Sequence, residues 1–174
     1  MLYQATKRYL IEKLKAAGLK TKPYTTMKTL EKSQESHIGA VLFDTETVSR
    51  NGSKTFYKDQ EGARKKRRKV FDRDLSFIVL IGEYNDDAVE ALYASFLEHL
   101  DEGLYVDGNY VPLEVEEAAW IDEDDSVLRA KVSVRVRITF HGGLYRDTGF
   151  APLSQVEVEA VTKQGKEPAD GEQE

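Results

Sequence analysis

Hydrophobic positions along this 174-residue chain follow two periods, and each period predicts its own kind of element. Apolar residues at helical spacing predict two helices, over 2–17 and from about 86 to 100. Gly18 is a natural stop for the first helix, and Asp86 or Asp87 can cap the second. Both helices have one apolar stripe, so each is expected to pack against another element.

Alternating hydrophobic positions predict strands, and the segment 70–82 gives the strongest signal. Both of its faces are apolar, which indicates a central strand covered on both sides. Asp107-Gly108 is a tight-hairpin signal. The other predicted strands cover 37–48, 104–106, 110–113, 113–121, 127–140 and 155–161. This order predicts an α+β fold, with a mainly antiparallel β-sheet and two main α-helices packed on one face.

A long excursion interrupts this pattern over 50–68, where the chain is polar and glycine-punctuated. We predict a hairpin or loop there, with a turn signal at Asn51-Gly52. The rest of the chain fits one α+β domain over 1–161. The last residues, 162–174, are rich in Gly, Pro, Lys and Glu and are predicted to be a disordered tail.

Composition supports a folded, water-soluble protein. The chain is 40% hydrophobic and 32% charged, with a formal net charge of −6. The longest apolar run, 77–81, is too short for a membrane helix, so no membrane partner is expected. There are no cysteines, which excludes disulfides and thiolate metal sites. Cytoplasmic residence is the default expectation.

Charge is unevenly distributed along the chain. Six consecutive cations stand together: Arg64, Lys65, Lys66, Arg67, Arg68 and Lys69. Four interpretations of this run stay open: a protein contact, a solvated loop, a sequence-blind nucleic-acid contact and a nuclear-localisation signal. The acidic run 122–125 of a neighbouring subunit is one surface on which it could dock.

Motifs for catalysis are missing from the sequence. The three histidines are not at metal-ligand spacing, and there is no nucleophile elbow, P-loop or dinucleotide fingerprint. We therefore predict no enzyme activity, no cofactor and no metal. His141, Asp147 and the acidic run are the only catalytic candidates to consider.

Three stretches together resemble the tail terminator proteins of tailed phages and related contractile particles. The first is the strand 73–82 followed by the helix 87–100, and the second is 113–122 before the acidic turn. The third is a long alternating strand that ends at 138–147, with a Gly-Gly-aromatic turn at Gly142-Gly143. The resemblance spans roughly 2–147 in element order.

The resemblance implies a virion structural protein that forms a homo-oligomeric ring, commonly of six subunits. Such a ring caps the tail tube, stops tube polymerisation and presents an interface to the head–tail connector protein. DNA would pass through its lumen without sequence-specific binding. The implied location is the tail or neck of the virion, after assembly in the host cytoplasm. Alternatives are another neck or head–tail joining protein, or a nucleic-acid-binding module that uses the run 64–69 as a basic loop.

Further charged residues are candidates for subunit contact or for lining the lumen. One set faces outward on the predicted strand 127–140, and the other belongs to the acidic turn that precedes it. These residues are Lys131, Arg135, Arg137, Asp122, Asp124 and Asp125.

Overall fold

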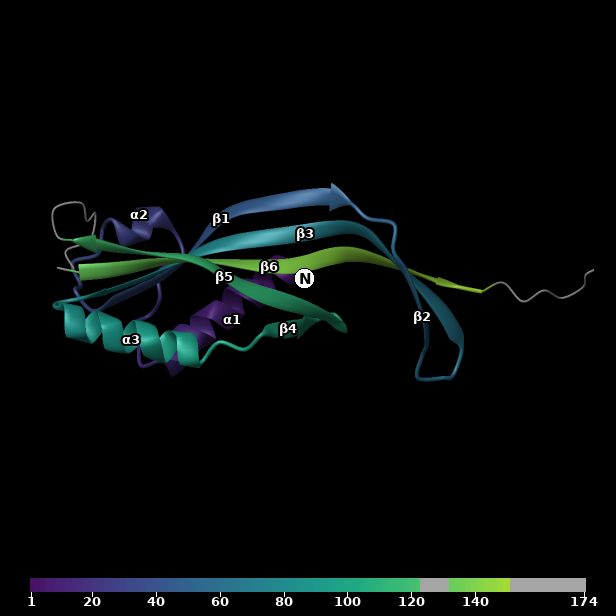
Figure 1. The fold of residues 1–174 in the computed structure, drawn as a ribbon, viewed down its shortest axis with the longest axis horizontal. Coiled ribbons are helices and arrows are strands. Elements are labelled where there is room, and N and C mark those ends of the chain that lie inside the picture. The colour runs from purple at the N-terminus through teal and green to yellow at the C-terminus, as the bar shows by residue number, and fades with distance from the viewer. Residues whose placement is uncertain (123–131, 151–174) are drawn as a thin grey trace, which may run out of the picture.

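A computed structural model describes residues 1–122 and 132–150 as an elongated, mainly antiparallel β-sheet with a few helices (Figure 1). The predicted α+β class is confirmed at this level. The helices are α1 (Leu2–Ala16), α2 (Met27–Leu30) and α3 (Asp86–Glu98). The strands are β1 (Ile38–Arg50), β2 (Lys54–Lys58), β3 (Arg64–Glu83), β4 (Gly103–Val106), β5 (Asn109–Asp122) and β6 (Val132–Gly149).

The strand order is β1-β3-β6-β5-β4, with β2 beside the first part of β3. All of these pairs are antiparallel. The central ladder joins β3 to β6 from Glu83 opposite Val132 to Lys65 opposite Gly149. At about 3.3 Å per residue, this ladder is roughly 60 Å long. The sheet therefore extends well past the helices, as Figure 1 shows.

The main core lies on one face of the sheet, where alternate residues of β3 and β6 meet side chains of α1 and α3. The inward β3 residues Leu75, Phe77, Val79 and Ile81 are fully buried, as the alternation predicts. Leu10 and Leu14 of α1 and Phe96 of α3 are fully buried in the same cluster.

A smaller cluster covers part of the opposite face. Leu30 of α2 packs there against apolar side chains of β1 and β3. Ile78 and Leu80 belong to this cluster, so β3 is covered on both sides at this point, as its two apolar faces predict. Neither cluster includes a described residue between 43 and 74 or after 140, so a long part of the sheet lies outside both hydrophobic clusters.

Glycines and caps set the ends of several elements. Gly18 follows α1 with φ of +116°, which confirms it as the stop. The predicted cap of α3 is wrong, because Asn85 caps it by accepting from the backbone N–H of Ala88 at 2.8 Å. Asp86 and Asp87 instead occupy the first turn, where carboxylates interact favourably with the helix dipole.

The predicted hairpin between β4 and β5 is confirmed. Asp107 and Gly108 both have positive φ, 50° and 75°, as a two-residue turn of this hand requires. No helix within 1–122 and 132–150 has the length and apolar character to cross a membrane. The predicted strand 155–161 and the tail 162–174 lie outside the described residues.

The predicted turn at Gly142-Gly143 is wrong, because β6 continues through both glycines to Gly149. The glycines make room for neighbouring side chains. A Cβ at Gly142 would collide with Leu2 of α1, and one at Gly143 would lie 3.0 Å from the Phe71 carbonyl oxygen and displace the end of the Lys69 side chain. Close packing across the strand accounts for this pair without any reversal of the chain.

Candidate functional site on the basic arm

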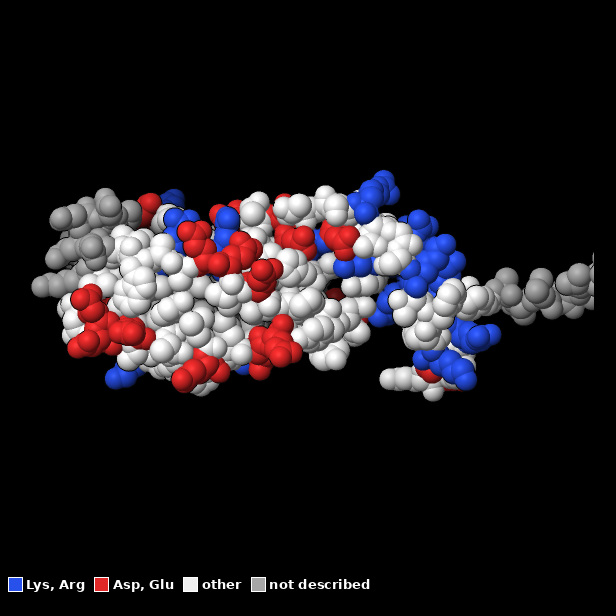
Figure 2. All heavy atoms as spheres, in the orientation of Figure 1, with Lys and Arg blue, Asp and Glu red and all other residues white. Residues whose placement is uncertain are grey.

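The sheet ends in an extension that we call the arm, made of residues 50–69 and 145–150. It carries ten Lys and Arg against three Asp and Glu, whereas the remaining chain carries 15 against 28. Figure 2 shows these cations gathered at one end of the molecule, with acidic residues spread over the body. The arm is therefore the most strongly charged feature of the described structure.

The predicted excursion is a hairpin, but its reversal lies at 59–63 and not at Asn51-Gly52. The Asp59 carboxylate accepts from the backbone N–H of Glu61 and Ala63 at 3.1 and 2.8 Å, and Gly62 has φ of +81°. Asn51 instead marks a short interruption between β1 and β2, where its side chain binds the backbone N–H of Ser53. The asparagine–glycine pair interrupts a strand without reversing it.

The basic run 64–69 is part of β3, so the expectation of a basic loop is wrong. Its residues pair with β2 on one side and with β6 on the other. Both flanks of this segment are thus hydrogen-bonded, and its side chains alternate between two faces. The six cations therefore form two rows of three, with different surroundings.

The odd-numbered row is neutralised within the chain. The Nζ of Lys65 lies 3.5 Å from Asp59, and the Nζ of Lys69 lies 2.6 Å from Asp72. Arg67 binds Asp147 through two hydrogen bonds, from Nε at 2.8 Å and from Nη2 at 2.7 Å. These three ion pairs are structural contacts of the arm.

Arg67 also fixes the arm against the body. Its Nη1 donates to the Asn109 side-chain oxygen at 3.0 Å, next to the tip of the β4–β5 hairpin. Its guanidinium lies 5.1 Å from the centroid of the Tyr57 ring. The hydrogen bonds from Arg67 lower the pKa of Asp147 and raise the pKa of Arg67, so both groups stay charged.

The opposite surface of the arm, which we call the even face, has a different composition. Cross-strand register and ring contacts assign to it Lys54, Phe56, Lys58, Arg64, Lys66, Arg68, Arg146, Thr148 and Phe150. Among residues 1–122 and 132–150, none of its six cations forms an ion pair with a carboxylate. Phe56 and Phe150 stack with ring centroids 5.8 Å apart and are 64% and 53% exposed.

Sequence reasoning found only part of this surface. It identified Arg64, Lys66 and Arg68, and it missed the cations and rings that β2 and the end of β6 contribute. The signal was present in β2, where Lys54, Phe56 and Lys58 alternate with other residues. The pairing partner of β2 could not be read from that pattern.

The other candidate residues lie away from the arm. Arg135 is exposed, and Arg137 is half-exposed and paired with Asp44 of β1. The structure places Asp122 at the end of β5, the opposite end of the sheet from the arm (Figure 1). Lys131, Asp124 and Asp125 lie outside the described residues. The basic arm and the end of β5 therefore do not meet within one chain.

His141 lies between two carboxylates on the sheet. Its Nδ1 is 3.0 Å from Asp74, and its Nε2 is 3.2 Å from Glu114. Asp147, the other catalytic candidate, is engaged by Arg67. In the part of the chain that the structure describes, no group of three or more His, Asp or Glu side chains is arranged to hold a metal ion.

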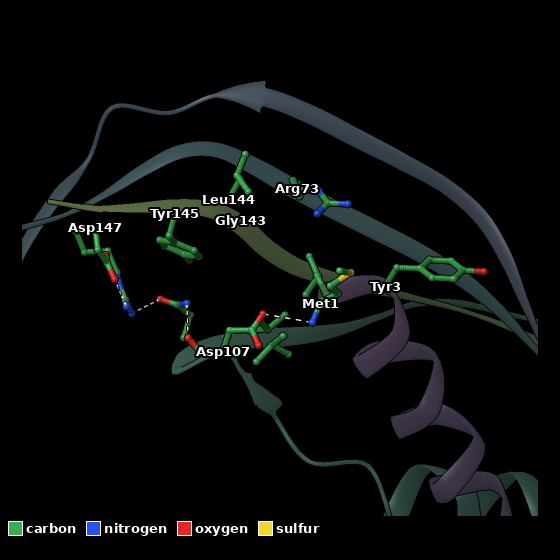
Figure 3. Close-up of a pocket in the computed structure, with 13 residues that line it drawn as sticks. Met1, Tyr3, Arg73, Asp107, Gly143, Leu144, Tyr145 and Asp147 are labelled. Atoms are coloured by element: carbon green, nitrogen blue, oxygen red, sulfur yellow. Dashed lines mark hydrogen bonds and ion pairs between the residues drawn. The ribbon is translucent and has the colours of Figure 1, made fainter. Parts of the chain in front are cut away.

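A pocket of about 460 Å³ lies between the N-terminus of α1, the β4–β5 hairpin and β6 (Figure 3). The Met1 amino group pairs with Asp107 across it at 3.3 Å. Asp147 lies at its far end, as Figure 3 shows, and Arg67, which binds Asp147, also lines the pocket. Its polar groups are thus largely bonded to one another, and the pocket connects the arm to the body.

Comparison with known proteins adds no family assignment. No protein-family model matches the chain, and no curated protein matches its sequence.

Proposed function

We propose that this chain is a virion structural protein of the tail-terminator type, which assembles into a homo-oligomeric ring. The observation that supports this most is a single sheet whose two outer edges are open. From Phe43 to Arg50, every β1 residue is exposed, and no strand of the described chain pairs with that edge. Within the described part of the chain, the outer edge of β5 is paired with a strand, β4, only over 109–112. Open edges are ready contact sites for another chain.

The directions of the two edge strands suit a head-to-tail contact. β1 runs antiparallel to β3, β3 to β6, and β6 to β5, so β1 and β5 run in opposite directions. If the β1 edge of one copy met the β5 edge of the next, the pairing would be antiparallel, which is the more stable arrangement. Repeated head-to-tail contact gives a ring when the rotation closes.

Two features restrict the length of this contact. Each edge has a β-bulge, between Phe43 and Thr45 in β1 and between Val115 and Glu117 in β5. Acidic side chains lie along both edges. Bulges and charges are the usual means by which edges resist continuous pairing. The proposed contact is therefore short and specific in register.

In the proposed ring, α1 and α3 form one layer over one sheet face, and the edges and the part of the other face that α2 leaves uncovered remain for neighbours. The assembled ring, hexameric as the resemblance to tail terminators implies, would cap the tail tube protein, stop its polymerisation and meet the head–tail connector protein. DNA would pass through the lumen, in a virion assembled in the host cytoplasm. A neck or head–tail joining ring is the nearest alternative, and no enzyme activity is part of the proposal.

Mass measurement and negative-stain electron microscopy of the purified chain test this proposal. We expect closed rings of six copies, alone or after addition of tail tube protein, and tubes that stop growing at the ring. A chain that stays a single copy in both conditions would contradict the proposal. Rings that bind connector protein but leave tube growth unchanged would identify the neck alternative.

A further inference from the structure

We infer that the even face of the arm binds the phosphate backbone of nucleic acid. The first argument is the direct opposition of like charges. Lys54, Arg68 and Arg146 are aligned across three neighbouring strands, and Lys58 lies opposite Arg64. Like charges in direct register destabilise a sheet. An external polyanion lying across these rows would convert the repulsion into attraction.

The spacing of the cations suits an extended polyanion. Arg64, Lys66 and Arg68 follow one another at every second residue of β3, which separates them by roughly 6.7 Å along the strand. The rows of β2 and β6 run beside them at about 4.8 Å. A charged backbone that lies along the arm therefore meets a cation at regular intervals, without any base-specific contact.

The exposed rings add a second kind of contact. Phe56 and Phe150 lie among the cations and present more than half of their surface to solvent. Proteins that bind single-stranded nucleic acid combine a positive surface with aromatic side chains on which bases stack. A solvated surface that served only solubility would need the cations and not the rings.

The distribution of charge favours nucleic acid over a protein partner. The centre of a protein interface is depleted of charged residues, whereas most of the even face consists of six cations that form no ion pair within the described residues. The odd row shows how carboxylates already satisfy the other cations of the arm. This inference is independent of ring formation, because a single arm carries the whole surface.

Two matched double variants test the inference. Lys54→Gln with Lys66→Gln removes two charges from the even face. Lys65→Gln with Lys69→Gln removes the same number of charges from the odd-numbered row. Binding of a fluorescent oligothymidylate of about 15 nucleotides is titrated at several salt concentrations, with the full chain. Thermal unfolding checks that each variant is folded.

We expect the even-face variant to lose affinity at least tenfold at low salt. Its slope of log K against log salt should fall by about 1.4, at roughly 0.7 per phosphate contact. The odd-face variant should keep both values. Phe56→Ala with Phe150→Ala should weaken single-strand binding by roughly tenfold and leave the salt slope unchanged.

Other results would overturn the inference. Equal losses in the two double variants would show an effect of net charge alone, and absence of binding by the unmodified chain at low salt would remove the premise. An even-face variant that binds the oligonucleotide normally but changes the oligomer mass in nucleic-acid-free buffer would assign the face to a second copy of the chain. Because ring formation is read from mass and this contact from titration, failure of one is distinguishable from failure of the other.

Discussion

The guanidinium of Arg67 joins three parts of the molecule. It belongs to β3, binds Asp147 of β6 through two hydrogen bonds and donates a third to Asn109 at the start of β5. A planar guanidinium that binds a carboxylate with two parallel hydrogen bonds fixes orientation as well as distance. This one side chain therefore holds the arm in a defined position relative to the body.

Asp147→Asn tests that role. The Asn amide is neutral and has only one acceptor oxygen, so it cannot replace both charged hydrogen bonds of the carboxylate. We therefore expect the arm to lose about 1 kcal/mol of local stability. This loss is modest because the pair is partly exposed. Amide hydrogen exchange in the arm should accelerate about fivefold at pH 7. Asp59→Asn is the control for loss of a carboxylate from the arm: it removes the longer ion pair to Lys65, but its amide oxygen can still accept the turn hydrogen bonds, so exchange should change less than in Asp147→Asn.

The same contact predicts a pH dependence. Arg67 lowers the pKa of Asp147 below its ordinary value of 3.8, so the ionised carboxylate stabilises the folded arm above that value. This contribution is lost as pH falls through the lower pKa of the folded state. The difference between the unmodified chain and Asp147→Asn should therefore shrink below pH 3.8. A constant difference across this range would show that Asp147 does not act through its charge.

At the scale of elements, hydrophobic periodicity correctly predicted which side chains of the strands and helices are buried. The alternation of β3 and the stripes of the two long helices correspond to side chains that the structure buries. Local signals were less reliable where distant segments decide the outcome. Gly142-Gly143 has the composition of a turn, but Leu2 and Lys69 occupy the space beside it, and those neighbours come from remote parts of the sequence.

The basic run illustrates the same limit. Six adjacent cations indicate a surface, but sequence alone gave no reason to divide them. The division follows from the pairing of β3 with β2 and β6, which places Asp59 and Asp147 near the odd row only. The site was therefore predictable as a charged segment, and its two faces were not.

Gly142→Ala tests the packing interpretation of the glycine pair. A methyl group there would collide with the buried Leu2 side chain, so we expect a loss of about 1–3 kcal/mol in the free energy of unfolding. Gly149→Ala, on the same strand, meets no atom and should change stability little. Urea denaturation measures both.

The collision also predicts a coupling between the two positions. Leu2→Ala makes room for the new methyl group, so the double variant should lose less stability than the sum of the two single losses. Strict additivity would mean that Gly142 is required for a reason other than the space it gives to Leu2.

At the scale of the whole molecule, the two ends of the long sheet differ in charge and in shape. The basic arm occupies one end of the long sheet, and β5 ends at Asp122 at the other end of a ladder that is roughly 60 Å long with the arm included (Figure 1). This is far beyond the Debye length of about 8 Å at physiological salt. The charges at the two ends therefore do not influence one another within one chain, and in the proposed head-to-tail arrangement the contact would form at the two sheet edges between them.

Complementary edge variants test the head-to-tail contact. Val48 of β1 and Val115 of β5 are 54% and 40% exposed, so lysine at either position is compatible with the folded chain. We expect Val48→Lys and Val115→Lys each to abolish the ring, because each destroys one of the two edges. Val48→Thr keeps a β-branched side chain and should retain the ring.

Mixing the two lysine variants separates head-to-tail from symmetric association. Each variant keeps the edge that the other has lost, so the mixture can form one intact contact between a Val115→Lys copy and a Val48→Lys copy. A second intact contact is impossible, and assembly should stop at heterodimers that mass measurement resolves. If β1 instead met β1, Val115→Lys would associate alone and the mixture would give no heterodimer. The stoichiometry of the mixture thus decides which edges meet, whatever the size of the complete ring.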